Sequence, residues 1–349
     1  MHRRTFLQTL IAPAFAAQAG AHIRLGYDTY SIRAYRLTAL DHLDLCAKWK
    51  LDAIQISSLG DFESLDPAYL AKVKSRAAAI GVSIDGGIGC ICPLSASWNA
   101  REGDPRQYLL KGLAAAKAVG ARSMRCFLGA AADRRGKYSM DRLIESTAKA
   151  LQSVRSEAID SGVRIAVENH SGDMQARELR TLIEQAGPDF VSACLDTGNP
   201  MWVVEDPLAA LEVLAPYVVT THIRDSALWD TPQGIWFQWV AMGDGSIDFK
   251  KFVNRYRELC PNAAMQLEVI TGRPPALLRC YEPEFWKAFP KADAADFARF
   301  VALAKNGKPY LGPMMIGGTG KQPASFEAAL KEQQMTDLER SLAYAKSIL

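Results

Sequence analysis

The sequence lacks the features that mark several large classes of protein. It has no run of roughly 20 consecutive apolar residues, which a membrane-spanning helix would need. The net charge is only +3 and no long stretch of lysine and arginine occurs, so the sequence gives no reason to expect a nucleic-acid partner. Seven cysteines are scattered through 349 residues without tight spacing, which is not the pattern of a disulfide framework.

The amino-terminal segment has the order of features found in a twin-arginine export signal. Arg3 and Arg4 precede a mildly apolar stretch over residues 10–17, and small residues suited to cleavage follow it. The alternative is a basic terminus without a targeting role. We expect residues 1–21 to be a removable signal and residues 22–349 to form a single domain. The protein is then expected in the periplasm or otherwise exported.

Short runs of apolar and β-branched residues alternate with longer segments of helical spacing. The predicted strands cover residues 23–27, 53–56, 82–85, 123–127, 163–168, 191–196, 218–222 and 265–269. The segments between them predict helices, including one long helix over 139–160 and a closing helix over 326–348. Eight such units predict an α/β fold, a (β/α)8 TIM barrel. No glycine-rich phosphate loop follows the first strand, which argues against a dinucleotide-binding fold.

One segment interrupts the alternation of strands and helices. Residues 271–323, between the eighth strand and the closing helix, are rich in proline, glycine and aromatic residues. We expect an insertion that lies over the barrel mouth; a packing appendage is the alternative. Arg273 and Arg279 within it are candidates for holding an anionic group of a substrate.

Four side chains that can bind a metal end four successive predicted strands. Glu168, Asp196, His222 and Glu268 each follow an apolar run. Since the active site of such a barrel lies at the carboxyl ends of its strands, these four side chains should converge. Three carboxylates around one imidazole would repel each other without a cation. The alternative for any one of them is a simple ion pair with arginine or lysine. We expect one divalent ion, Mn²⁺ ahead of Mg²⁺, Co²⁺, Fe²⁺ or Zn²⁺.

Five short motifs contain or surround these residues. They are Ala166-Val167-Glu168-Asn169-His170, Leu195-Asp196-Thr197-Gly198-Asn199, His222-Ile223-Arg224-Asp225, Gly243-Asp244-Gly245-Ser246-Ile247-Asp248-Phe249 and Leu267-Glu268. Their order and spacing resemble the sugar phosphate isomerase/epimerase family, part of the xylose isomerase-like barrel superfamily. The resemblance implies that the four residues above bind the metal. It also implies that Glu168 and Glu268 are catalytic, moving protons on opposite sides of the substrate through a metal-stabilised enediolate.

Further side chains are expected around the substrate. His170 lies two residues after Glu168 and either contacts the substrate or hydrogen-bonds behind the metal ligands. Arg224 either lines the pocket or serves as an ion-pair partner. Trp229 and Trp239 lie in an aromatic stretch after the seventh strand, where their rings either stack on a sugar or plug the loop.

The sequence departs from the ketose 3-epimerases of this family at two positions. By the resemblance, Asn199 stands where those enzymes carry a second histidine, and Leu228 stands where they carry an arginine. Because those groups hold substrate hydroxyls, we expect Asn199 at the substrate, and a simple ketohexose is not the expected substrate.

These observations predict a divalent-metal-dependent isomerase or epimerase that acts on a sugar or keto-sugar. A metal-dependent lyase or hydratase acting on 3-keto-glycosides is the first alternative, because some exported relatives act on such compounds. An endonuclease IV-like nuclease is disfavoured by the presence of only five histidines and by the low net charge. A non-catalytic sugar-binding barrel would not need opposed carboxylates beside a metal. The expected partner is therefore a small-molecule sugar, and the sequence does not indicate an oligomeric state.

Overall fold

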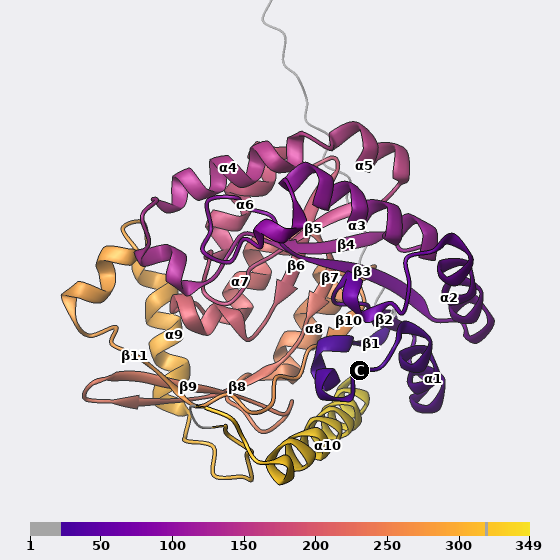
Figure 1. Ribbon diagram of the computed structural model, residues 1–349. Coiled ribbons are helices and arrows are strands. Elements are labelled where there is room, and N and C mark those ends of the chain that lie inside the picture. The colour runs from indigo at the N-terminus through magenta and orange to yellow at the C-terminus, as the bar shows by residue number, and fades with distance from the viewer. Residues whose placement is uncertain (1–21, 318–319) are drawn as a thin grey trace, which may run out of the picture.

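The computed structural model describes residues 22–317 and 320–349, and the predicted export signal lies outside the described residues. Eight parallel strands form one sheet in the spatial order β10-β1-β2-β3-β4-β5-β6-β7 (Figure 1). These strands are β1 (Leu25–Asp28), β2 (Ala53–Gln55), β3 (Ser83–Cys90), β4 (Ser123–Phe127), β5 (Arg164–Glu168), β6 (Val191–Asp196), β7 (Val218–His222) and β10 (Met265–Leu267). Each contains or overlaps a strand predicted from the sequence.

The two end strands of this sheet meet, so the sheet curls into a barrel. The Ile223 amide donates to the Gln266 carbonyl at 2.8 Å, and the Glu268 amide donates to the Ile223 carbonyl at 3.0 Å. Ile223 and Leu267 form a parallel bridge at the same place. These contacts join the end of β7 to β10 and confirm the predicted TIM barrel.

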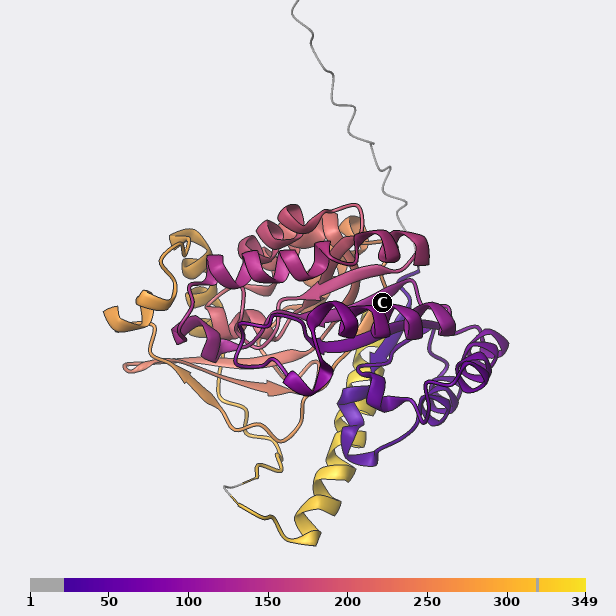
Figure 2. The ribbon, with the colours of Figure 1, turned by 45° about the horizontal axis from the view of Figure 1, so that its top comes forward.

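Helices follow the strands and surround the barrel, as two views of the molecule show (Figures 1 and 2). They are α1 (Ala39–Trp49), α2 (Pro67–Ile80), α3 (Pro105–Val119), α4 (Met140–Gln152), α5 (Arg155–Ser161), α6 (Ala176–Ala186), α7 (Pro207–Leu214), α8 (Phe249–Leu259), α9 (Ala294–Asn306) and α10 (Ala324–Ile348). Local sequence sets their ends. The Asp104 side chain accepts from the Gln107 amide at the start of α3, and Gly120 ends that helix with a φ of 77°. No helix in the described ranges is both long and apolar enough to cross a bilayer.

The helix predicted over 139–160 is two helices. α4 ends at Gln152 and α5 begins at Arg155, and Val154 between them has non-helical dihedral angles of −119° and 17°. Val154 is fully buried, and the Ser153 hydroxyl donates to the Ala150 carbonyl at 2.6 Å. The apolar side chain of Val154 is therefore buried at the break between α4 and α5. A continuous helix would orient this side chain differently.

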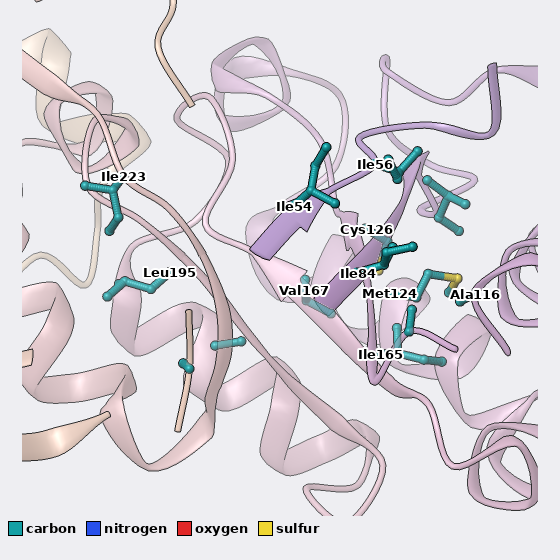
Figure 3. Packing of buried hydrophobic residues seen from close by; sticks show 14 of the residues in the cluster. Ile54, Ile56, Ile84, Ala116, Met124, Cys126, Ile165, Val167, Leu195 and Ile223 are labelled. Atoms are coloured by element: carbon teal, nitrogen blue, oxygen red, sulfur yellow. The ribbon is translucent and has the colours of Figure 1, made fainter. Parts of the chain in front are cut away.

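Strand alternation separates the apolar layer from the site. Ile165 and Val167 of β5 belong to the hydrophobic core between the sheet and its surrounding helices (Figure 3). Glu168 in the same strand points the other way, into the barrel, because successive side chains of a strand face opposite sides. The same alternation brings the predicted ligands of neighbouring strands to one point.

The barrel interior beneath the site is polar. The Asp85 carboxylate of β3 accepts hydrogen bonds from the side chains of Ser123 at 2.7 Å, Thr220 at 2.9 Å and Gln266 at 3.2 Å. Burial raises the pKa of Asp85, although these hydrogen bonds oppose the rise. This layer links strands β3, β4, β7 and β10 below the candidate ligands.

A second, antiparallel sheet lies outside the barrel, and the sequence analysis did not predict it. It consists of β8 (Asp225–Thr231), β9 (Gly234–Val240) and β11 (Ala276–Leu278) in the order β11-β9-β8. β8 and β9 form a hairpin directly after β7, and α9 packs against β8. The segment 271–323 contributes β11 and α9 to this unit (Figure 1). That this segment covers the mouth stays a prediction.

Candidate metal centre and active site

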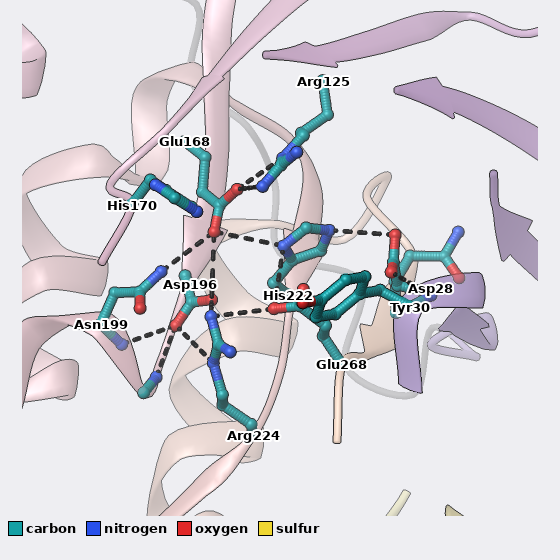
Figure 4. A network of polar contacts seen from close by, with 12 residues as sticks. Asp28, Tyr30, Arg125, Glu168, His170, Asp196, Asn199, His222, Arg224 and Glu268 are labelled. Atoms are coloured by element: carbon teal, nitrogen blue, oxygen red, sulfur yellow. Dashed lines mark hydrogen bonds and ion pairs between the residues drawn. The ribbon is translucent and has the colours of Figure 1, made fainter. Parts of the chain in front are cut away.

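The four predicted metal ligands come together at the carboxyl ends of their strands. Glu168, Asp196 and His222 end β5, β6 and β7, and Glu268 directly follows β10. One donor atom from each lies within 4.8 Å of the others, and all four side chains are buried. Asp196 and His222 are register partners in adjacent strands. Figure 4 shows their side chains pointing toward one another.

Two buried atoms at this point lack a hydrogen bond. His222 Nδ1 lies 3.3 Å from both Glu168 Oε1 and Glu268 Oε2, but the geometry gives no hydrogen bond to either. Glu268 Oε2 is also without one. A buried imidazole nitrogen that lacks a hydrogen bond and faces carboxylate oxygens fits a bound cation, although the Arg224 guanidinium also reaches these carboxylates. The donor set therefore suits one divalent metal ion.

The opposite side of the His222 ring is also held. His222 Nε2 lies 3.3 Å from Asp28 Oδ2, and the side-chain amide of Gln55 contacts the same nitrogen. Asp28 ends β1 and Gln55 ends β2, and both are fully buried. A carboxylate behind a ligating histidine fixes the ring and its tautomer. Neither residue was predicted, although each stands at a strand end as the four ligands do.

Arg224 lies among the candidate ligands. Its Nη2 contacts Asp196 and lies 2.8 Å from Glu268 Oε2 and 3.9 Å from Glu168 Oε1. The guanidinium also stacks over the Trp239 ring, 4.4 Å from its centroid. The sequence left Arg224 as either a pocket residue or an ion-pair partner; in the structure it lines the cavity and also pairs with the carboxylates of the cluster, whose negative charge it offsets.

Arg125 is a second buried arginine at the site, and the sequence analysis missed it. Its Nε donates to Glu168 Oε2 at 2.5 Å, and its Nη1 donates to the Ile88 carbonyl at 3.2 Å. Arg125 lies inside β4 rather than at its end, so a search of strand ends could not find it. An arginine inside an otherwise mostly apolar strand was the available signal. A buried arginine requires a charged or polar partner, so its presence in the strand indicates a polar site inside the barrel.

The two glutamates are ionised in this arrangement. Burial would raise the pKa of Glu168, but Arg125 and His222 outweigh it and hold the pKa well below its usual value. Burial likewise opposes ionisation of Glu268, while Arg224 and His222 lower its pKa to about 2.

The pKa values of the other two candidate ligands, Asp196 and His222, are raised instead of lowered. Burial raises the pKa of Asp196 to about 7, despite the opposing effect of Arg224. Burial lowers the pKa of His222, but the thiol of Cys194 and the carboxylates of Glu268 and Glu168 raise it well above its usual value. The two carboxylates favour a protonated, positively charged imidazole. A bound cation would take the place of that proton.

A cavity of about 560 Å³ opens above the cluster. Glu268, Arg224, His170 and Trp239 line it, so these predicted residues meet at one pocket. The lining also includes residues that the sequence analysis did not single out: Tyr30, Arg33, Ser57, Asp61, Tyr108, Arg125, Phe127 and Ile270. Half of these lie in the segments that follow β1 and β2, and two lie within β4.

His170 and Asn199 occupy different positions relative to this cavity. His170 lines it, stacks on Phe127 with a centroid distance of 3.8 Å, and places Nδ1 2.6 Å from the Gly129 carbonyl. Burial lowers the pKa of His170 to about 4, so the ring is neutral near pH 7. Asn199 lies behind the cluster, where its Nδ2 donates to Glu168 Oε1 at 3.0 Å. Asn199 is not among the residues that line the cavity.

The two predicted tryptophans lie on opposite faces of the β8–β9 hairpin. Trp239 lines the cavity and donates through Nε1 to the Gly198 carbonyl at 3.2 Å. Trp229 is paired across the hairpin with Trp236, and their rings stack at 6.0 Å. Trp229 is not among the residues that line the cavity. The structure therefore brings one of the two to the site.

Relatives in sequence are distant. The chain is 30% identical over 97 residues to the uncharacterised protein YihM of Escherichia coli K12. This match covers 28% of this chain and 29% of YihM. The chain thus matches less than a third of that relative's length. It is 23% identical over 209 residues to the 3-oxo-isoapionate decarboxylase of Pectobacterium atrosepticum, covering 59% of this chain and 68% of that enzyme.

Solved structures share the architecture. A D-psicose 3-epimerase determined in the presence of D-fructose has a TM-score of 0.56 at 16% identity, covering 80% of this chain and 97% of that one. The IolI protein with a bound zinc atom has a TM-score of 0.55 at 15% identity, covering 81% and 98%. At these identities the likeness shows the fold alone. The model of the family described as xylose isomerase-like TIM barrel matches residues 43–284, which is most of the chain. The chain therefore belongs to the xylose isomerase-like TIM barrel family.

Proposed function

We propose that this protein is a divalent-metal-dependent isomerase or epimerase that acts on a sugar or keto-sugar. The convergence of Glu168, Asp196, His222 and Glu268 at the floor of a cavity carries the proposal. Two atoms of this set, on His222 and Glu268, are buried without a hydrogen bond. The names of the D-psicose 3-epimerase and of other structural neighbours, such as an L-ribulose 3-epimerase, agree with sugar chemistry.

The proposed roles follow from the surroundings of each side chain. Glu168, Asp196, His222 and Glu268 would hold a divalent ion, which would supply polarisation of a substrate carbonyl and so would acidify the neighbouring C–H group. Glu268 faces the cavity as an ionised carboxylate and accepts that proton. Glu168, whose Oε1 lies 3.3 Å from His222 Nδ1, is ionised in this arrangement; it would first take up a proton and would then deliver it to the opposite face of the substrate. Arg125 and Asn199 hold Glu168 in place through its two oxygens.

A lyase is the second candidate. The same abstraction of a proton beside a carbonyl, followed by loss of a group from the adjacent carbon, gives elimination instead of isomerisation. The sequence similarity to a 3-oxo-isoapionate decarboxylase supports a lyase in general, since that enzyme is named for bond cleavage, although decarboxylation itself needs no abstraction of a C–H proton. Both candidates need the same cluster and the same base.

Elemental analysis and hydrogen exchange together test the proposal. The purified protein should hold about one divalent ion per chain, and the Glu168→Ala/His222→Ala double variant should hold none. With that ion, a panel of sugars in deuterated water should contain at least one that gains deuterium or loses a group. The Glu268→Gln variant should keep the metal but lose exchange by roughly 100-fold or more, because it removes the base.

A surface variant, Glu212→Gln, serves as the matched control, since Glu212 is exposed, pairs with Arg255 and does not line the cavity. It should retain both metal and exchange. Full exchange in Glu268→Gln with the metal bound would refute the assigned role of Glu268. Absence of metal binding to the unaltered protein would refute the proposed function.

A further inference from the structure

Four arginines line the cavity above the candidate metal centre, but only two of them have carboxylate partners. Arg125 and Arg224 form ion pairs with the carboxylates of the cluster. Arg33 and Arg273 line the same cavity, and neither forms an ion pair with a carboxylate in the described part of the chain. Two positive charges therefore face the cavity without a protein anion.

Arg33 is fixed in position without being neutralised. It lies in the 3₁₀ helix Thr29–Tyr35, which follows β1, and is half-buried. Its Nη1 donates to the Tyr30 carbonyl at 3.3 Å, its Nη2 donates to the Thr271 carbonyl at 3.2 Å, and its guanidinium lies 4.5 Å from the centre of the Tyr30 ring. All three partners are uncharged, so they orient the guanidinium and leave its charge available.

Arg273 brings a second positive charge to the same end of the cavity. It follows β10, which is the neighbour of β1 in the barrel. Burial lowers the pKa of Arg33; repulsion from Arg273 and Arg224 adds to this fall, and attraction to the Glu268 carboxylate opposes it. Arg273 is exposed, so water screens part of this repulsion, and an anion between the two guanidinium groups would offset more of it. The arrangement thus favours an anionic ligand.

The remaining charges of the cavity do not supply that anion. With a divalent ion bound, the ion together with Arg125 and Arg224 balances the negative charges of the cluster and of Asp28. Asp61, which also lines the cavity, accepts from the Thr29 hydroxyl at 2.6 Å and from a backbone amide rather than from either arginine.

We propose that the substrate is a sugar that carries an oxyanion, either a carboxylate or a phosphate, and that Arg33 and Arg273 bind this group. Arginine suits the role because its planar guanidinium pairs with the oxygens of both groups. The inference rests on the proposed function, because it names the substrate class of the same site. Arg279, the other arginine considered in this segment, pairs with Glu282 instead and does not line the cavity.

The test compares three ligands with the same carbon chain in the metal-loaded protein. D-Glucitol is neutral, D-gluconate carries a carboxylate, and D-glucitol 6-phosphate carries a phosphate. Titration calorimetry should show that at least one of the two anions binds roughly 10-fold or more tightly than D-glucitol. Tighter binding of D-gluconate indicates a sugar acid, and tighter binding of D-glucitol 6-phosphate indicates a sugar phosphate.

Three variants locate the effect. Arg33→Gln/Arg273→Gln should remove the preference, so that the variant binds the anions no more tightly than it binds D-glucitol. Arg33→Lys/Arg273→Lys should retain part of it, because the charge remains without the planar geometry. Arg279→Gln is the matched control from the same segment and should bind as the unaltered protein does. Unchanged melting temperature and metal content establish that each variant is folded.

The outcomes separate this inference from the proposed function. Equal binding of the three ligands, no binding of any, or a preference that survives the double glutamine variant overturns the inference. An arginine-dependent preference without hydrogen exchange on any sugar supports the inference and refutes the proposed function. Exchange that is as fast on neutral sugars as on their anionic counterparts, in both the unaltered protein and the double glutamine variant, supports the function and overturns the inference.

Discussion

Arg224 shows how one positively charged side chain can offset the negative charge of several buried carboxylates. Its guanidinium reaches Asp196 and Glu268 directly and lies 3.9 Å from Glu168. Removing either partner from a buried ion pair is costly, because the remaining charge has neither water nor a counterion. Arg224 therefore supports the fold in the absence of a metal ion as well as lining the cavity.

Replacing Arg224 by methionine should destabilise the metal-free protein by about 3–5 kcal/mol, the usual effect of breaking a buried ion pair. Added Mn²⁺ should raise the melting temperature of this variant by more than it raises that of the unaltered protein, since the ion replaces the lost positive charge. Calorimetric melting with and without Mn²⁺ measures both effects.

The matched control is Arg255→Met. Arg255 pairs with Glu212 and Glu258 on the surface, where water screens the charges. Its loss should change the melting temperature little. An Arg224→Met protein that melts at the same temperature as the unaltered one without metal would contradict the role assigned to Arg224.

At the residue scale, the sequence allowed the four side chains that cluster at the site to be predicted, but not the residues that form ion pairs and hydrogen bonds with them. Glu168 and Asp196 could be located because acidic residues after apolar runs mark the ends of strands. Arg125 lies within a strand, and only the alternation of β4 turns it into the barrel. Asp28 and Gln55 come from strands far away in sequence, and their contact with His222 depends on the closure of the barrel.

The β8–β9 hairpin decides which aromatic residues reach the site. Trp229 and Trp236 are direct cross-strand partners and share one face, whereas Phe237 and Trp239 face the other. Trp202 contacts both Phe237 and Trp239 on that second face. From the sequence alone the register of the hairpin was unknown, so the two predicted tryptophans could not be separated.

The loop before α7 contains Glu205, a buried carboxyl group whose pKa is raised. Glu205 is buried, and its oxygens accept from the Ala176 amide, at the start of α6, at 3.1 and 3.3 Å. Burial raises the pKa of Glu205 from 4.5 to about 8, although the Ala176 amide opposes the rise. In the folded protein Glu205 is therefore protonated over a pH range in which the unfolded chain is ionised.

Stability should consequently fall as the pH rises from about 4.5 to about 8. Over that window the folded state binds a proton that the unfolded state has released, and the loss is on the order of 4 kcal/mol. Glu205→Gln keeps the acceptor for the Ala176 amide and has no proton to lose. We expect urea unfolding to show that Glu205→Gln is more stable than the unaltered protein at pH 8.5, with a smaller difference at pH 5.

Glu258→Gln is the control for this titration, because Glu258 is exposed and pairs with Arg255. Its difference in unfolding free energy from the unaltered protein should stay nearly constant across the same pH range. A Glu205→Gln difference that is equally constant would show that Glu205 is ionised in the folded protein.

At the scale of the whole molecule, the alternation of strand and helix is enough to predict the barrel. Each unit is local, and the apolar faces of its strand and helix can be identified from periodicity. The second sheet could not be predicted in this way, because β11 pairs with β9 from beyond the eighth barrel strand. The break at Val154 was also missed, since the helical pattern continues through it.

Metal binding should stabilise the whole barrel, because its ligands come from four strands. At a free Mn²⁺ concentration 100 times the dissociation constant, the expected gain is about 2.7 kcal/mol. Removing metal with a chelator should lower the melting temperature, and restoring Mn²⁺ should reverse the change. The Glu168→Ala/His222→Ala variant should show no dependence on either treatment; a shift equal to that of the unaltered protein would place the metal elsewhere.

The last helix of the chain supports the first loop of the site. The Ala34 amide, next to Arg33, donates to Gln334 of α10 at 3.0 Å across 300 residues of sequence, and Thr271 donates to Asp337 of the same helix at 2.9 Å. Figure 2 shows α10 beside the segment that follows β1. During synthesis, the barrel strands leave the ribosome before these contacts can exist. The arginine-lined end of the cavity is thus completed only when α10 docks, so a nascent chain whose candidate metal ligands have already met still lacks the two hydrogen bonds that support Ala34 and Thr271 beside Arg33.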